Sequence, residues 1–574
     1  MISRVSSTAR VSDQAAASAA DRQRSLPRAA DGLAIGLLVA EAAVIEYFLR
    51  HLLSRPFYYD EAWRGWTIAQ GFGFLGHLKT AVGPLALGYL AIENLARIAL
   101  GDNETALRTP MFLVLPVLGV ATYLLARRWL GTVVSFCVAA LLLVNLWIVN
   151  YGLQLKSYSY EALFAVITIG LYLLLRRPAW RGWQLLGLSA ALGLTCVFSV
   201  PNLFVAGPLL VLDFVETVRA RQRLRLRITG EVLAGVIALA HLKFFLSPQG
   251  AVAGTNYFAT QYAPHGIGPF VRFAFDGLTS YVPSVITGVA GANNAVPAYR
   301  LPPLEHHVLA VGLAILLVAG IVAAVRDAAG RALIVAVGGA LVLELFASAL
   351  HEWPFGLIRQ NIFVFPLLYI LGGMGGVWLA RALRGPRRSQ AGAPIPLAAW
   401  RGMAMVVAVA LLVATVAAGG LTTAKTFVQS SQLQNKPAEF SGVKAAVADA
   451  RRTAAPGDLV IIRADRFTPA WYGVAWVYYM DQYTGWPAAL ARRPGVPEDD
   501  TISVIYVTPG AVRSFLAAHP GSKTIFLLEF IIPGNTFPPS LHLQSLHTLR
   551  QFGYCPVANS SYAVTGQLTT LNKC

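Results

Sequence analysis

The sequence predicts a polytopic α-helical membrane protein that carries a small C-terminal α/β domain outside the membrane. Of its 574 residues, 56% are hydrophobic and only 13% are charged, and the mean hydropathy is +0.57. A soluble globular domain has about 25% charged residues. The chain therefore has more apolar surface than a water-soluble protein buries, which excludes a soluble enzyme, a disordered chain and a fibrous repeat.

Apolar runs long enough to cross a membrane follow one another along the chain. A spanning helix needs about 20 residues. A polar leader, residues 1–31, precedes the first run and shows no cleavable signal peptide. We predict a transmembrane domain over residues 32–424 with eleven spans, which cover residues 32–53, 109–126, 132–150, 159–175, 184–200, 202–218, 229–247, 307–325, 331–350, 361–380 and 402–421.

Arginine residues are concentrated in every second connection between these runs. Basic loops of membrane proteins face the cytoplasm. The leader is basic, so the N-terminus is predicted to be cytoplasmic and, after eleven crossings, the C-terminus to be outside. The basic residues of the later loops are Arg127, Arg128, Arg176, Arg177, Arg181, the arginines at alternate positions from Arg219 to Arg227, Arg326, Arg331, Arg381, Arg384, Arg387 and Arg388.

The net charge of +18 follows from these loops and does not indicate a nucleic-acid-binding protein. Arginine far outnumbers lysine, which is typical of GC-rich bacterial genomes, so we expect the plasma membrane of a bacterium. Cys137 and Cys196 lie in predicted spans. Cys555 and Cys574 lie in the C-terminal domain, where an oxidising exterior permits a disulfide that the sequence alone does not establish.

Two long connections, residues 54–108 and 248–305, are predicted to be external. Within the first, segment 84–100 is nearly long enough to span, but it contains Glu93 and Arg97. Counting it as a span would invert every later loop, so we predict a helix that lies in the outer interface. The second connection is rich in Gly, Pro, Asn and Tyr, which predicts an irregular segment over the membrane face.

The character of the chain changes over residues 425–574, where strand-like and helical patterns alternate as in a small α/β domain. Strands are predicted at Asp458–Arg463, Ile502–Val507 and Thr524–Phe530, and helices near 511–519 and 541–551. The domain either holds a polymeric acceptor or braces the external loops. Its aromatic cluster fits a sugar-binding surface, a domain core or a contact with the membrane domain, and comprises Trp471, Tyr472, Trp476, Tyr478, Tyr479, Tyr483 and Trp486.

Two adjacent carboxylates, Asp60 and Glu61, follow the first predicted span, with aromatic residues on both sides. Removing a carboxylate from water costs several kcal/mol unless it is compensated. The pair fits either the cap of a helix on a wet loop or a sheltered reactive cleft.

Three further passages extend this pattern on the same predicted side of the membrane: Gly83–Leu95 with Gly101–Arg108, Gln154–Ser159, and Trp353–Arg359. Together with Asp60-Glu61 they resemble the GT-C superfamily of polyprenyl-phosphate-sugar-dependent glycosyltransferases. Within it, the chain resembles the family of protein O-mannosyltransferases and of the aminoarabinose transferase of lipid A modification. The resemblance covers residues 32–425.

This resemblance implies transfer of a sugar from a polyprenyl phosphate to a hydroxyl, with inversion at the anomeric carbon. It implies that Asp60 is the general base, and we expect Glu61 to orient the acceptor or share that role. Lys156 and Arg359, with Tyr158, are the candidates for binding the donor phosphate. The alternative for both cations is an interaction with lipid headgroups at helix ends.

The remaining polar candidates have less specific roles. Asp102 and Glu104 either shape the acceptor site or cap a helix, and His351 and Glu352 follow a predicted span without metal-ligand spacing. We therefore predict no metal and no cofactor. The predicted partners are the lipid-linked sugar, the bilayer and a protein, glycan or glycolipid acceptor. The competing function is a transporter or flippase for lipid-linked sugars, which would favour internal repeats and polar sites at the midplane.

Overall fold

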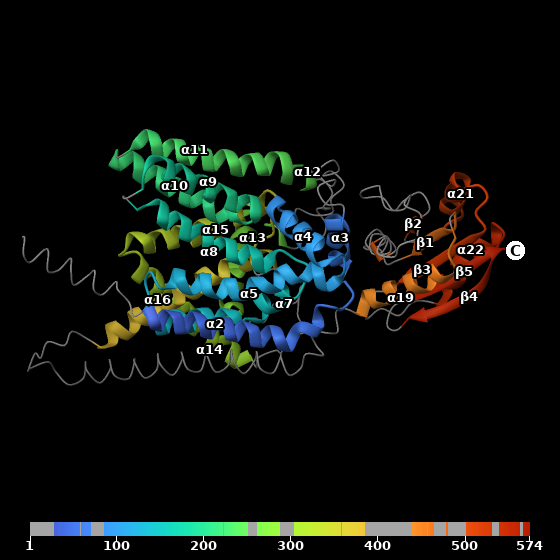
Figure 1. Ribbon diagram of the computed structural model, residues 1–574, viewed down its shortest axis with the longest axis horizontal. Helices are drawn as coiled ribbons and strands as arrows, with labels where there is room; N and C mark the ends of the chain where they lie inside the picture. Colours follow the sequence, from blue (N-terminus) through green and yellow to red (C-terminus); the bar gives the residue numbers. More distant parts are fainter. Residues whose placement is uncertain are drawn as a thin grey trace, which may run out of the picture.

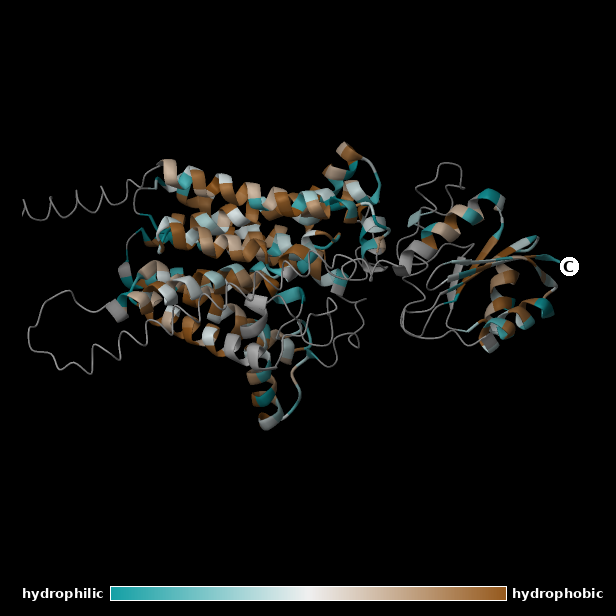
Figure 2. Cartoon of the chain, turned by 90° about the horizontal axis from the view of Figure 1, so that it is seen from below, coloured by the Kyte–Doolittle hydropathy of each residue, from teal (hydrophilic) through white to brown (hydrophobic). Residues whose placement is uncertain are grey.

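A helical bundle and a C-terminal α/β domain lie one after the other along the long axis of the protein (Figure 1). The computed structural model describes residues 28–57, 59–69, 85–177, 180–221, 223–250, 261–287, 303–356, 359–384, 438–455, 457–463, 478–479, 501–504, 506–530, 539–562 and 566–574. Hydrophobic residues predominate along the bundle helices, and hydrophilic residues gather at the two ends of the bundle (Figure 2). This distribution is that of a polytopic membrane protein.

The predicted spans within the described residues coincide with helices, and the last one, 402–421, lies outside the described residues. Six described segments are long and apolar enough to cross a membrane: Ala29–Leu52, Glu104–Ala126, Tyr158–Leu175, Leu224–Gln249, Ala328–Ala349 and Arg359–Ala382. The bundle elements are α2 (Arg28–Leu49), η1 (Arg50–Leu52), α3 (Tyr59–Ala69), α4 (Leu87–Leu100), α5 (Glu104–Ala126), α6 (Thr132–Leu143), α7 (Leu146–Gly152), α8 (Tyr158–Leu175), α9 (Gly182–Phe198), α10 (Asn202–Ala220), α11 (Leu224–His241), η3 (Leu242–Leu246), α12 (Ser247–Gly250), α13 (Ile267–Thr287), α14 (Pro303–Ala324), α15 (Ala328–Ala349), η5 (Arg359–Val364) and α16 (Phe365–Arg384).

Small residues let the bundle helices approach closely, as expected where lipid gives no hydrophobic driving force between helices. A Cβ atom added to Gly320 of α14 would lie 2.1 Å from the carbonyl oxygen of Leu371 on α16. One added to Gly375 of α16 would lie 1.9 Å from the carbonyl oxygen of Leu316. These two glycines therefore set the contact between α14 and α16.

Loops that are basic in the sequence gather at one end of the bundle. Arg127 at the end of α5 pairs with Asp31 at the start of α2 at 2.9 Å. The indole of Trp129 donates to Asp327, in the connection between α14 and α15, at 3.1 Å. The start of α2 lies at the end of the bundle away from the C-terminal domain (Figure 1). The start of α2, the α5–α6 connection and the α14–α15 connection, which the sequence assigns to one side, therefore lie together.

Two segments of the bundle refine the sequence prediction. The run 132–150 is one predicted span but forms two helices, α6 and α7, because the Asn145 side chain accepts hydrogen bonds from the backbone of Trp147 and Ile148 and caps α7. Segment 84–100 forms α4, whose 14 residues extend only about 21 Å. That length is too short to cross the hydrocarbon layer. This agrees with the pattern of basic loops, which predicted that the segment is not a span.

The prediction of an irregular segment is wrong for residues 267–287, which form α13. Its exposed apolar residues, Ile267, Val271, Phe275 and Leu278, recur at helical spacing along one side. The glycine and proline content of the surrounding connection concealed this local period.

The C-terminal domain contains a five-stranded sheet in the order β2-β1-β3-β5-β4. The strands are β1 (Leu459–Arg463), β2 (Thr501–Val504), β3 (Thr524–Phe530), β4 (Tyr554–Tyr562) and β5 (Gly566–Lys573), and the helices are α19 (Ala438–Thr453), α21 (Pro509–Ala518) and α22 (Pro539–Gln551). β1 pairs in parallel with β2 and β3, whereas β5 pairs antiparallel with β3 and β4. The three predicted strands and two predicted helices are confirmed, and the β4–β5 hairpin and α19 are additional.

The sheet buries both faces because successive side chains of a strand point to opposite sides. Leu459 and Ile461 join the cluster that contains Val512 and Phe515 of α21 and Leu549 of α22. Val460, Ile462, Phe526 and Leu528 join the other cluster, which includes Val443 and Val447 of α19 and continues into the helical bundle. One of the two hydrophobic clusters of the C-terminal domain is therefore continuous with the core of the membrane domain.

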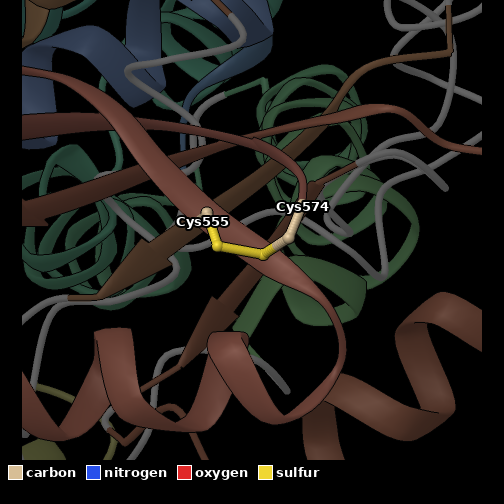
Figure 3. Close-up of a disulfide and its surroundings, with 2 residues drawn as sticks. All are labelled: Cys555 and Cys574. Carbon is tan, nitrogen blue, oxygen red and sulfur yellow. A yellow bond between two sulfur atoms is a disulfide. The ribbon is translucent and has the colours of Figure 1, made fainter.

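Cys555 and Cys574 form the disulfide that the sequence left open (Figure 3). Their Cα atoms lie 5.4 Å apart, on neighbouring antiparallel strands near the chain end. The bond ties the last residue of the chain to the start of β4. Cys196 is buried in α9, as expected of a packing residue, whereas Cys137 of α6 is exposed.

Candidate active site

Glu61, on α3, is fully buried and has donors on both carboxylate oxygens. Arg108 of α5 forms a bidentate pair with it: Nε donates to Oε1 at 3.0 Å, and Nη2 donates to Oε2 at 3.0 Å. Nη1 of Arg108 also donates to the backbone oxygens of Leu53, at 2.7 Å, and of Arg55. This guanidinium therefore fixes the chain that enters α3 as well as the helix itself.

A second connection joins α3 to the passage between α7 and α8. The backbone N–H of Leu155 donates to Oε1 of Glu61 at 2.7 Å, although the two residues are 94 positions apart. The backbone oxygen of Leu155 accepts from Nη1 of Arg64, also on α3, at 3.4 Å. Two passages that the sequence singled out separately, Phe57–Trp63 and Gln154–Ser159, thus lie against each other.

Lys156 and Tyr158 flank this contact and are both buried. The Lys156 ammonium lies 5.8 Å from the centre of the Tyr151 ring. The guanidinium of Arg64 lies 5.7 Å from the centre of the Tyr158 ring. Lys156 directly follows Leu155, which contacts α3, and its ammonium and the Arg64 guanidinium are both of the kind that binds phosphate oxygens.

Asp60 is the second residue of α3 and directly precedes Glu61, and its side chain lies outside the described part of the structure. Arg108 and Leu155 together donate three hydrogen bonds to the Glu61 carboxylate, which has about four acceptor positions. Burial lowers the pKa of Arg55 to about 10, and the charge of Glu61 opposes that shift. The electrostatic role of Glu61 is therefore to balance buried guanidinium charge.

A buried acid on α4, Glu93, faces the same cluster. Its side chain is fully buried, and neither of its oxygens has a hydrogen-bond partner among the described residues. Burial raises the pKa of Glu93 well above its ordinary value, and the nearby Arg64 offsets part of this rise. Burial also raises the pKa of Tyr89, one turn earlier on α4, with the charge of Glu93 as a further cause.

Asp102 and Glu104 lie where the bundle meets the C-terminal domain. The Tyr478 hydroxyl donates to Oδ1 of Asp102 at 3.3 Å. The Lys444 ammonium forms an ion pair with Glu104, which is 5% exposed. The cap of α5 predicted at this position is supplied by neither acid but by Asn103, whose side chain accepts from the backbone N–H of Ala106.

His351 and Glu352 are exposed at the end of α15, away from any described contact with α3. The His351 ring lies 5.1 Å from that of Tyr262 and 6.0 Å from that of His265. Among the described residues, no group of three or more His, Cys, Asp or Glu side chains is arranged to hold a metal ion.

Arg359 opens η5, an element that packs against α8 and α7. Its side chain is half-buried. The passage before it is fixed by Asn361, whose amide donates to the backbone oxygens of Pro354 and Gly356 at 2.9 and 3.0 Å. The structure thus brings Arg359 to the helices that carry the Lys156 passage, but it gives no described contact between the two cations.

The overall arrangement is similar to that of two kinds of solved membrane protein. ArnT from Cupriavidus metallidurans, in its apo state, superposes with a TM-score of 0.51 at 14% identity, over 94% of this chain and 98% of that one. The same protein bound to undecaprenyl phosphate gives a TM-score of 0.50 at 15% identity, over the same shares. The apo oligosaccharyltransferase of Archaeoglobus fulgidus gives 0.50 at 11% identity, over 86% and 69%.

The chain has the GT-C fold. No protein-family model matches the sequence, and no curated protein does. At 11–15% identity this likeness concerns the fold alone, and chemistry is a property of the side chains at the site.

Three residues of the candidate site were absent from the sequence prediction. Arg64 follows Asp60 by four positions, so the 3.6-residue period of a helix places it on the same side of α3. Glu93 was noted only as an argument against a span. Arg108 was noted only as the last residue of the passage Gly101–Arg108. The sequence does not indicate that its partner is Glu61, 47 positions earlier.

Proposed function

We propose that the protein is a membrane glycosyltransferase. It moves a sugar from a polyprenyl phosphate to a hydroxyl acceptor on the outer face of the membrane. The observation that carries the proposal is the contact between α3, with its Asp60-Glu61 pair, and the Lys156–Tyr158 passage, through the hydrogen bond of Leu155 to Glu61. A base and an anion site must adjoin for such a reaction, and the GT-C fold supports it. ArnT, which shares that fold, binds undecaprenyl phosphate.

In this proposal Asp60 is the general base. The acceptor oxygen attacks the anomeric carbon, its proton passes to the Asp60 carboxylate, and the bond from that carbon to the phosphate oxygen breaks with its electron pair. A single displacement inverts the anomeric centre. Glu61 is assigned a positioning role instead of the shared base role, because Arg108 and Leu155 occupy its oxygens.

The leaving polyprenyl phosphate is a weakly basic dianion, so it needs positive charge and no proton donor. We assign Lys156 and Arg64 to this charge, together with Arg359 from the start of η5. Tyr158 shapes the same wall. Arginine offers a planar fork for phosphate oxygens, and lysine offers a point charge. The proposed reaction therefore needs no metal and no cofactor.

We place the reaction on the extracytoplasmic side of a bacterial plasma membrane, with the N-terminus in the cytoplasm. The disulfide between Cys555 and Cys574 supports this side for the C-terminal domain, because such bonds persist in oxidising compartments. The acceptor is a hydroxyl of a protein, a glycan or a glycolipid, and the donor sugar is a hexose or pentose. Asp102 and Glu104 are assigned to the wall of the acceptor side.

The proposal is tested with the purified full chain in detergent, a set of polyprenyl-phosphate sugars and extracted cell-envelope acceptors. We expect transfer by the wild type and a loss of at least about 100-fold in Asp60→Asn, the scale of general base catalysis. The matched control is Asp276→Asn, since Asp276 is an exposed acid of α13. Full turnover by Asp60→Asn would remove the base assignment.

The same assay separates this function from lipid-linked sugar transport. Detergent solution has no compartments, so turnover there requires chemistry at the protein. Absence of any transfer, combined with movement of a lipid-linked sugar across reconstituted vesicles, would support the transporter alternative and overturn the transferase.

A further inference from the structure

A compact set of contacts joins the C-terminal domain to the loop that leads into α3. The Tyr479 hydroxyl accepts a hydrogen bond from the backbone N–H of Phe57 at 2.7 Å. The ring of Tyr478 lies 5.3 Å from that of Phe57, centre to centre. Both tyrosines are at most 1% exposed.

Tyr478 also lies directly on the surface of α3. A Cβ atom added at Gly65 would lie 3.1 Å from Cε2 of Tyr478 and 3.0 Å from Cε2 of Phe57. Such distances are shorter than ordinary carbon contacts, so only glycine fits there without displacing the rings. The helix that carries Asp60 and Glu61 is thus built to receive this tyrosine.

An ion pair forms a second contact between the C-terminal domain and the bundle. Lys444 of α19 pairs with Glu104 in the first turn of α5, and its ammonium lies 5.6 Å from the centre of the Tyr479 ring. One turn further along, α5 presents Arg108, the residue that holds Glu61. The C-terminal domain therefore contacts both helices whose side chains form the Glu61–Arg108 pair.

Continuity of the core makes these contacts cooperative. The buried apolar cluster runs from the bundle through Phe57, Tyr478 and Tyr479 to Val447 of α19 and Phe526 of β3 without a break. A second cluster, around Val512 and Phe515, is closed within the domain, so the continuity with the bundle runs along the α19 face of the sheet. Motion of the sheet relative to the bundle must therefore disturb the entry to α3.

We propose that Tyr478, Tyr479 and Lys444 are positioning residues through which the C-terminal domain holds α3 and its carboxylates in place. The catalytic consequence rests on the proposed transferase function, whereas the mechanical consequence does not. Because the domain acts through α3, which carries Asp60 and, among the proposed phosphate-binding cations, only Arg64, its loss lowers kcat more than it raises the KM for the lipid-linked donor.

The test compares Tyr479→Phe, Tyr478→Ala and Lys444→Ala in the full chain. The first leaves the Phe57 N–H without its acceptor. Tyr506→Phe is the matched control, because Tyr506 is an exposed tyrosine of the same domain. We expect Tyr479→Phe to lower kcat roughly tenfold, which corresponds to one net hydrogen bond. Tyr478→Phe should retain more activity than Tyr478→Ala because it keeps the ring.

Hydrogen–deuterium exchange provides a readout that a general loss of folding would not mimic. We expect faster exchange in the peptide that covers residues 53–69 in the three variants, with unchanged exchange in α14 and α16. Gly65→Ala approaches the same contact from the bundle side and should have the same effect. The double variant Gly65→Ala/Tyr478→Ala should exchange more slowly than the sum of the two single effects predicts, because removal of the Tyr478 ring relieves one of the two close contacts of the added methyl group, the other being with Phe57.

The two proposals fail in different ways. If the wild type transfers no sugar but residues 53–69 exchange faster in the variants, the transferase is wrong and the positioning role remains. If the variants keep the kcat and the exchange of the wild type, the positioning role is wrong. A change in donor KM with unchanged kcat would also overturn it, since it would place the tyrosines on the substrate.

Discussion

The buried ion pair between Glu61 and Arg108 predicts how substitution of either residue changes the stability of the protein. Both side chains are 0% exposed, and the pair ties α3 to α5. Arg108 also donates to the backbone oxygens of Leu53, Arg55 and Pro56. Substitution of either partner by an apolar or neutral residue leaves the other charge buried without compensation.

The magnitude follows from that burial. Removing one partner of a buried ion pair costs about 3–5 kcal/mol, whereas replacing both by apolar side chains of similar volume is often close to neutral. We therefore expect large losses of stability in Glu61→Leu and in Arg108→Met, and a much smaller loss in the double variant. Arg108→Lys should lie between the extremes, because lysine keeps the charge but loses the bidentate fork.

Thermal unfolding of the purified chain in detergent measures the coupling of this pair as a double-mutant cycle. We expect an interaction energy of several kcal/mol. The double variant should therefore lose much less unfolding free energy than the two single variants lose together. Additive losses would refute the reasoning, since they would mean that the two charges do not compensate each other. The control cycle is the exposed pair Arg272–Asp276 on α13, for which we expect less than about 1 kcal/mol.

Further predictions concern charge, cross-linking and metal. Burial raises the pKa of Glu93, so the folded chain keeps a proton that the unfolded chain releases as the pH rises. Rising pH therefore destabilises the fold through this residue. Because Gln is neutral at every pH, Glu93→Gln should raise the melting temperature more at pH 8 than at pH 5. Replacement of Cys555 and Cys574 by serine should destabilise the C-terminal domain by about 2–4 kcal/mol, detected as faster proteolysis after residue 438, with little change in the bundle. Treatment with EDTA should leave sugar transfer unchanged, and a loss that added metal restores would contradict the proposed chemistry. Lys156→Met should raise the donor KM and lower kcat more than Lys243→Met, since Lys243 lies in η3 and is exposed.

Much of the fold was predictable because a membrane imposes simple constraints on sequence. The length of a span, the exclusion of charge from hydrocarbon and the arginine bias of one side are local properties that each segment satisfies separately. They correctly excluded α4 as a span. They did not predict the division of 132–150 into α6 and α7, because Asn145 reads as one polar residue in an apolar run until its capping hydrogen bonds are seen.

The prediction was weakest where structure depends on partners distant in the chain. The β4–β5 hairpin has a polar sequence and is stabilised by pairing with β3 and by the disulfide. Among the predicted aromatic cluster, Tyr478 and Tyr479 form a domain contact with Phe57, and the other members lie outside the described residues. A sequence contains the tyrosines but not the surface that buries them.

The sequence by itself indicated that the chain crosses a membrane, and it predicted which loops share a side and that acids and cations collect on one of those sides. Only the tertiary structure decided what each of them contacts. It assigned Glu61 to Arg108 and Leu155, placed Arg64 against Tyr158, buried Glu93 in the same cluster and joined the C-terminal domain to α3. The reason is that hydropathy acts on each residue where it stands, whereas ion pairs and hydrogen bonds act between residues that the fold alone brings together.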